Sequence, residues 1–285
     1  MPTPQEVQTE IANNLRNRMA IVQNAMPMMQ PLQTQQISGT VTTSNNQLTF
    51  APRLTGLIVG FLVEVNATLN NAGAATANRT NGGALNILSR IAFTDLNNYT
   101  RINTNGYHLG LLNNVKNTRG YGGAVAPNLP YNVGNVWTVN SLASTIATGA
   151  TPALRQFFYV PVAYSPQDLT GAIYAQVVNA TMQLQLTINA APGVVATDPL
   201  FAVYSGATAA GSITVTNVTV AVTTLYYNTA TPRGGRFPLP MVDLSRAYLV
   251  QDQVANMTVV ANSDCAAAFA NARTFYSTFA VYDNN

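Results

Sequence analysis

The chain has 285 residues, of which 47% are hydrophobic and only 8% are charged, against roughly 25% charged in typical soluble domains. Its net charge of +3 comes from scattered arginines without Lys/Arg runs, so we expect no sequence-specific binding of nucleic acid. The one cysteine, Cys265, excludes an intrachain disulfide framework and a multi-cysteine metal site. The composition predicts a folded chain whose neutral amide- and hydroxyl-rich surface can pack against copies of itself without burying unpaired charges.

Residues 1–36 are predicted to form an amphipathic helix and an arm. Pro4 suits a first helical turn, and Pro27 and Pro31 end the helix after about residue 25. Two interpretations remain open: the helix packs on its own domain, or it docks on a membrane surface or a neighbouring subunit. Arg16 lies opposite the apolar stripe of this helix, and Arg18 lies near the edge of the stripe. The stripe consists of apolar residues at spacings of four or three: Val7, Ile11, Leu15, Met19, Val22 and Met26.

The sequence favours neither a secretion signal nor a transmembrane helix. Its first residues, MPTPQEV, lack the charged and apolar regions of a signal peptide. The most apolar run, LTGLIVGFLVEV, reaches Glu64 after about ten residues, too few to span the roughly 30 Å core of a bilayer.

Residues 37–228 are predicted to fold as one antiparallel sandwich or jelly roll. In the segment 57–69, alternate residues from Leu57 and Val59 to Leu69 are predicted to face one side. The apolar alternation slips by one residue near Asn217, which predicts a β-bulge. Pro161 favours an edge or bulge position for its strand.

Residues 229–240, rich in proline and glycine, are the predicted linker, and residues 241–285 follow it. About 45 residues are under half of a sandwich domain. They either complete the first sandwich or begin a second one, and we expect the latter, with the native chain continuing beyond Asn285.

The only histidine, His108, lies near Asp95 and Arg101, which could suggest acid–base chemistry. However, Thr104 or Asn105 can cap a short helix that places His108 on an amphipathic edge. No nucleophile elbow is present, and one histidine cannot supply a cupin metal site. We predict a structural histidine, with Asp95 and Arg101 as solvated residues flanking a turn, and no catalytic, cofactor or metal site.

Four segments, VGFLVEVNATLNN, VPVAYSPQDLTGAIYAQV, FPLPMVDLSRAYLVQDQ and STFAVYDN, occur in this order. Together they resemble the major capsid protein of tectiviruses, which are tailless, membrane-containing bacteriophages. The resemblance implies a mainly β double jelly roll, two stacked eight-stranded antiparallel sandwiches after an N-terminal α-helix, with the second barrel incomplete in this chain. It also implies that three chains form a pseudo-hexagonal capsomer, and that capsomers form an icosahedral shell over an internal membrane.

The resemblance further implies a place for the helix beneath the shell, near the membrane and neighbouring capsomers, with Arg16 and Arg18 facing anionic lipid. Penton and minor capsid proteins are the other expected partners, and no cofactor is expected. The leading hypothesis is therefore a structural protein of the virion, synthesised in the host cytoplasm. A jelly-roll viral spike that binds a receptor or carbohydrate is the alternative, although Trp137 has no cluster of exposed aromatic residues around it. An enzyme is the weakest hypothesis.

Overall fold

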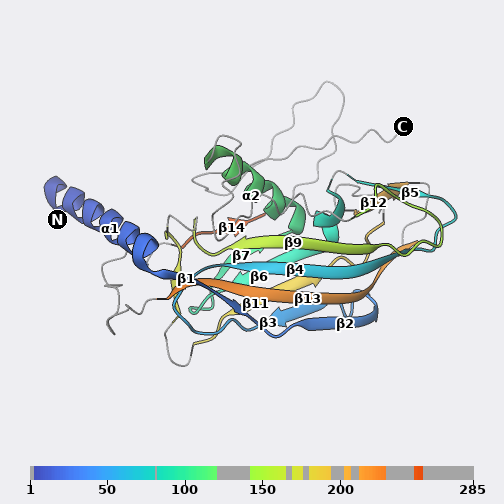
Figure 1. Cartoon of the computed structure of the whole chain (residues 1–285), viewed down its shortest axis with the longest axis horizontal. Helices are drawn as coiled ribbons and strands as arrows, with labels where there is room; N and C mark the ends of the chain where they lie inside the picture. The colour runs from blue at the N-terminus through green and yellow to red at the C-terminus, as the bar shows by residue number, and fades with distance from the viewer. Residues whose placement is uncertain are drawn as a thin grey trace, which may run out of the picture.

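The computed structural model describes residues 3–80, 82–120, 142–164, 169–175, 180–193, 202–206, 212–228 and 247–252. This part of the chain is mainly β, with an N-terminal α-helix that projects from one end (Figure 1). Both features agree with the sequence-based fold class. Of residues 241–285, which were expected to begin a second barrel, the structure describes only 247–252, and these pair with the first sandwich.

The first sheet is built around one long antiparallel pair. The strand β13 pairs on one side with β4, and on its other side with β1 and β2 at successive positions. β9 and β10 likewise occupy successive positions along the free side of β4. The sheet is therefore four strands across. Its strands are β1 (Met26–Pro31), β2 (Gln35–Thr40), β4 (Leu57–Asn71), β9 (Ala153–Pro161), β10 (Ile173–Tyr174) and β13 (Ile213–Asn228).

The second sheet has the order β14-β7-β6-β11-β3 and faces the first (Figure 1). Four of its strands pair antiparallel, so the two sheets give the four-on-four arrangement of an eight-stranded sandwich. β14 is an additional strand, and its pairing with β7 is the one parallel pairing among the described strands. The strands are β3 (Gln47–Phe50), β6 (Leu88–Thr94), β7 (Thr100–Thr104), β11 (Gln183–Ile188) and β14 (Val250–Gln251).

A small third sheet and three helices complete the described structure. The third sheet has the order β12-β5-β8. The helix α2 packs beside β9, where the Asn113 side-chain amide donates to the Tyr159 carbonyl at 2.8 Å. The elements are β5 (Ala77–Arg79), β8 (Thr145–Ile146), β12 (Tyr204–Gly206), α1 (Pro4–Asn24), α2 (Gly106–Gly120) and the 3₁₀ helix η1 (Gly83–Ile87).

The main core lies between the two sheets. From Phe61 onward, alternate residues of β4 are buried in it, as the period of two predicts. Phe61 on β4 meets Phe93 on β6 with ring centroids 5.1 Å apart, and both side chains are fully buried. This aromatic pair joins the two sheets directly.

Leu57 and Val59 do not share the face of Phe61, so that part of the sequence prediction is wrong. Both belong to a second buried cluster, which also includes Leu225. The cause is a register shift of β4 against β13 beside Gly60, which moves the residues before it to the opposite face. A Cβ at Gly60 would lie 2.7 Å from the Tyr159 ring, so the close packing there requires glycine.

The bulge predicted near Asn217 is confirmed. The pairing of β13 with β4 shifts between Thr216 and Thr219, and Asn217 has a φ of 51°. Its side-chain oxygen accepts a hydrogen bond from the Gly39 amide at 3.2 Å. Asparagine tolerates this left-handed conformation better than residues with a branched Cβ. The prediction for Pro161 is also confirmed, because it ends β9, whose one partner among the described strands is β4.

Substitution of Asn217 tests the strain at this bulge. We expect Asn217→Val to lower the free energy of unfolding by about 1–2 kcal/mol more than Asn217→Gly, because both lose the bond to Gly39 but only valine opposes a positive φ. Urea denaturation followed by circular dichroism measures both variants. Equal losses would show that the positive φ carries no cost.

Candidate assembly site

The N-terminus of α1 is stabilised by its own residues. The Thr3 side chain accepts from the Glu6 amide at 3.3 Å, and the Glu6 carboxylate accepts from the Thr3 amide at 2.7 Å. This is a complete capping box, with Pro4 in the first turn as predicted. The hydrogen bond from the Thr3 backbone, followed by that from its hydroxyl, lowers the pKa of Glu6 below its ordinary value of 4.5. The first turn can therefore form without a neighbouring element.

Acid should loosen this first turn. Because the pKa of Glu6 is lowered in the folded chain, the contribution of the carboxylate is fully present above pH 4.5 and is lost as the pH falls through the lowered pKa. At neutral pH we expect Thr3→Ala to open the first turn roughly fivefold more often, as measured by amide hydrogen exchange. Thr9→Ala is the matched control, since the Thr9 hydroxyl bonds the Gln5 carbonyl within the helix. Equal effects of the two variants would show that the cap contributes nothing.

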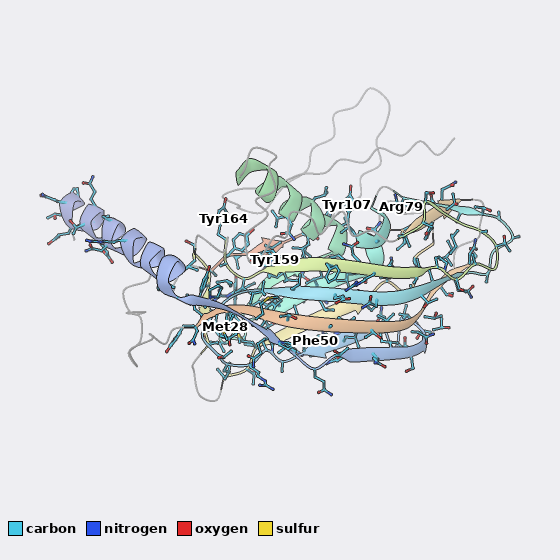
Figure 2. The ribbon with its side chains drawn as sticks, viewed as in Figure 1. Met28, Phe50, Arg79, Tyr107, Tyr159 and Tyr164 are labelled. Carbon is cyan, nitrogen blue, oxygen red and sulfur yellow. The ribbon has the colours of Figure 1, made fainter. Side chains whose placement is uncertain are left out.

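The C-terminal end of α1 is the part that attaches to the sandwich. Ile21 is 1% exposed, and Ala25 is 5% exposed. They pack on the outer face of the first sheet, in the second buried cluster, whose other members are Leu57, Val59, Tyr159, Ala163, Leu169, Ala172, Leu225 and Tyr227. Tyr159 is labelled on β9 at the end nearer α1 (Figure 2). The extended backbone of Ala25 leads directly into β1, where Met26 pairs with Asn228. The helix is thus anchored by its last turn.

The rest of α1 extends away from the sandwich (Figure 1). Every residue before position 17 whose exposure the structure describes is exposed, including Val7 at 39% and Arg16. The side chains of the other predicted contact residues lie outside the described part: Ile11, Leu15, Arg18, Met19 and Val22. Within the part of the chain that the structure describes, no helix combines the length and apolar character needed to cross a membrane.

The anchoring residues Ile21 and Ala25 were missed by the sequence pattern. With 3.6 residues per turn, Ile21 lies about 100° around the helix axis from Val22, which belongs to the predicted stripe. The only available signal was a pair of apolar residues four apart at the end of the helix. That pattern is too common to distinguish an anchor from the edge of the stripe.

The turn predicted between Asp95 and Arg101 is confirmed, and it joins β6 to β7. Asn105 caps α2, because its side-chain oxygen accepts from the His108 amide at 2.8 Å. His108 therefore sits in the first turn of a helix, as expected.

Asp95 and Arg101 are not solvated, so that prediction is wrong. Their side chains are 4% and 10% exposed, and Arg101 Nε contacts Asp95 Oδ2 at 2.5 Å. Asp95 Oδ1 also accepts from the amides of Asn97 and Tyr99, while Arg101 Nη1 donates to the Gly171 carbonyl at 2.8 Å. The pair closes the β6–β7 turn and ties it to the loop before β10.

His108 has an acidic partner, Asp252, that the sequence did not indicate. Its Nδ1 lies 2.8 Å from Asp252 Oδ2, across 144 positions of sequence. The Thr104 hydroxyl donates to the carboxylate at 2.7 Å rather than to the imidazole, so the histidine does not activate it as a nucleophile. The arrangement has the features of a structural contact.

Known proteins identify the kind of molecule that this fold and projecting helix represent. The family model described as "P3 major capsid protein N-terminal" matches residues 5–230. The chain is 31% identical over 281 residues to the "Major capsid protein P3" of Enterobacteria phage PRD1, covering 97% of this chain and 70% of that protein.

Solved structures also resemble the chain, at low sequence identity. The crystal structure of the STIV major capsid protein matches with a TM-score of 0.45 and 11% identity, over 72% of this chain and 49% of that one. A structure of Sulfolobus Turreted Icosahedral Virus matches with a TM-score of 0.43 and 12% identity, over 74% and 51%. The chain spans about half the length of these proteins. Since both TM-scores are below 0.5, the assignment rests on the sequence relationship.

The molecule is thus a structural protein of a virus capsid, located in the virion, and not an enzyme. The chain belongs to the P3 major capsid protein family. This relationship does not favour the alternative of a receptor- or carbohydrate-binding spike.

Proposed function

We propose that the chain forms trimeric, pseudo-hexagonal capsomers that build an icosahedral shell over an internal membrane, with α1 beneath the shell in contact with lipid. Penton and minor capsid proteins would be the further partners of the shell. The observation that carries the proposal for α1 is its geometry, because Ile21 and Ala25 are buried on the sandwich whereas the described residues before position 17 are exposed.

The sequence of α1 supports a lipid surface as its contact. The acidic residues Glu6 and Glu10 lie in the first half, whereas Arg16 and Arg18 lie in the second, nearer the sandwich. Arginines flanking an apolar stripe suit an interfacial position on anionic lipid, each contributing about 1 kcal/mol near such a surface.

The trimer is tested by light scattering on the purified protein, combined with the chain mass measured by mass spectrometry. We expect a particle of three chains. A monomer that persists at micromolar concentration would contradict the capsomer proposal.

The lipid contact is tested by photo-cross-linking from within assembled virions. We expect lipid adducts from cross-linkers at Ala12 and Asn13 on α1 and none from Ser44, which is also exposed but lies on the sandwich. Adducts to capsid protein alone at positions 12 and 13 would instead make α1 a contact between subunits.

A further inference from the structure

The segment 247–252 returns to the first sandwich after the predicted linker. Val250 pairs with Ile102, and the Asp252 amide donates to the Asn103 carbonyl at 3.0 Å. A strand of two residues contributes few ladder hydrogen bonds, and parallel pairing is slightly less stable per residue than antiparallel pairing. The β14–β7 ladder alone is therefore a weak attachment.

The Asp252 carboxylate adds three polar contacts at the start of α2. Oδ1 accepts from the Thr104 hydroxyl at 2.7 Å, and Oδ2 accepts from the Asn105 amide at 3.0 Å and lies 2.8 Å from His108 Nδ1. A carboxylate only accepts hydrogen bonds, so His108 Nδ1 donates to Asp252 in the tautomer that carries the hydrogen there; the Asn105 amide nitrogen lies 3.0 Å from the same Nδ1. The negative charge also lies at the positive end of the α2 dipole. The side chains of Asp252 and His108 are 18% and 23% exposed, so they are partly shielded from water.

Two arginines near this end of β7 have other partners. Arg101 is paired with Asp95, and Arg90 on β6 donates to the Asn103 side-chain oxygen at 2.9 Å. Among the side chains of α2 that the structure describes, the imidazole of His108 is the one that contacts the Asp252 carboxylate.

Other contacts also hold the segment, among them the Gln251 side-chain amide, which donates to the Thr100 carbonyl at 3.4 Å. Tyr248, two residues before β14, meets Tyr164 edge-on with ring centroids 5.7 Å apart. Gly171 also lies against Tyr248, where an added Cβ would come within 2.6 Å of the Tyr248 Cβ. Apolar contacts of this kind are weakly directional, whereas a carboxylate bound by three donors fits at only one register.

We propose that Asp252 fixes the position of the segment 247–252 on the first sandwich, and we call this contact the register clasp. It binds the cap of α2 through Thr104, Asn105 and His108, and so holds the chain downstream of residues 229–240 at one defined position on the first sandwich. The contact joins residues separated by 144 to 148 positions of sequence. This inference is independent of the proposed membrane contact.

Hydrogen–deuterium exchange on the full chain in its native assembly tests the clasp. We expect Asp252→Asn, which keeps the shape but removes the charge and one acceptor, to raise exchange in peptides covering 247–252 and 104–110 by about tenfold. Leu249→Ala is the matched control, because Leu249 lies in the same segment and is 44% exposed. It should change exchange less than twofold. Exchange in Asp252→Asn that remains within twofold of the unmodified chain would overturn the proposal.

A second variant keeps the test decisive if Asp252→Asn does not fold. His108→Gln removes one of the three donors and should raise exchange in 247–252 by about threefold. In the double variant the effect of Asp252→Asn should be smaller than in the unmodified background, because the two residues share one contact. Unchanged exchange in His108→Gln, or strictly additive effects in the double variant, would show that the ladder and Tyr248 hold the segment without the clasp.

Discussion

We expect replacing Arg101 by methionine to lower the free energy of unfolding by about 3–5 kcal/mol, because it leaves the buried Asp95 carboxylate without its cation. Two amides would still donate to Asp95 Oδ1, but Oδ2 would lose its guanidinium donor. The Gly171 carbonyl would lose its donor as well. Urea denaturation followed by circular dichroism measures the loss. A cost of this size is a large part of the roughly 5–15 kcal/mol that stabilises a typical domain.

Arg155→Met is the matched control for this prediction. Arg155 Nε lies 2.7 Å from Glu64 Oε1, a similar contact by geometry, but its side chain is 54% exposed and that of Glu64 is 26% exposed. Solvent screening limits such pairs to about 0–1 kcal/mol. Comparable losses in the two arginine variants would contradict the claim that burial makes the Asp95–Arg101 pair critical.

Phe61→Ala should also cost about 3–5 kcal/mol, because it opens a cavity where the two sheets meet. Phe93→Ala should cost a similar amount from the opposite sheet. The control is Tyr99→Ala, whose side chain is 50% exposed and which should change the free energy of unfolding by about 0.5 kcal/mol or less. Thermal and urea denaturation of the three variants give the comparison.

A double-mutant cycle separates the aromatic contact from general burial. The ring planes of Phe61 and Phe93 are tilted by 59°, a geometry that adds about 0.5–1.5 kcal/mol beyond buried area. We expect a coupling energy in that range. If the two losses simply add, the rings contribute only as independent apolar surface.

Local patterns predicted much of the fold. The helix of residues 4–24 follows from Pro4, the acidic first turn and the prolines after residue 25. The bulge at Asn217 was visible as a one-residue slip in the apolar alternation, because a strand with one buried face cannot change register without moving its side chains. The edge position of β9 followed from Pro161, which cannot donate to a neighbouring strand.

Contacts distant in sequence could not be predicted in the same way. Asp252 meets His108 only after the chain has passed through nearly the whole sandwich, and nothing in the spacing of the two residues indicates this. Asp95 and Arg101 are close in sequence, but their burial depends on the loop that carries Gly171. The sequence therefore predicted the turn correctly and the environment of its charged residues incorrectly.

In the candidate site, too, the local helix pattern was predictable and the contacts distant in sequence were not. Periodicity identified α1 and its exposed Val7 and Arg16, yet the anchor at Ile21 depends on an outer apolar cluster. That cluster exists because the register shift beside Gly60 turns Leu57 and Val59 outward. A pattern of strict alternation places these two side chains in the interior, and so conceals the surface on which the helix sits.

The long central pair of strands has a mechanical consequence for a shell protein. β4 and β13 have 15 and 16 residues, so each is roughly 50 Å long. They stay paired at thirteen registered positions across both register shifts. Tension applied along these strands would have to shear the ladder hydrogen bonds together rather than open them one after another. The first sandwich should therefore be stiff along β4 and β13 and more compliant across them, and a shell built from it would resist stretching most strongly where these strands run along the line of stress.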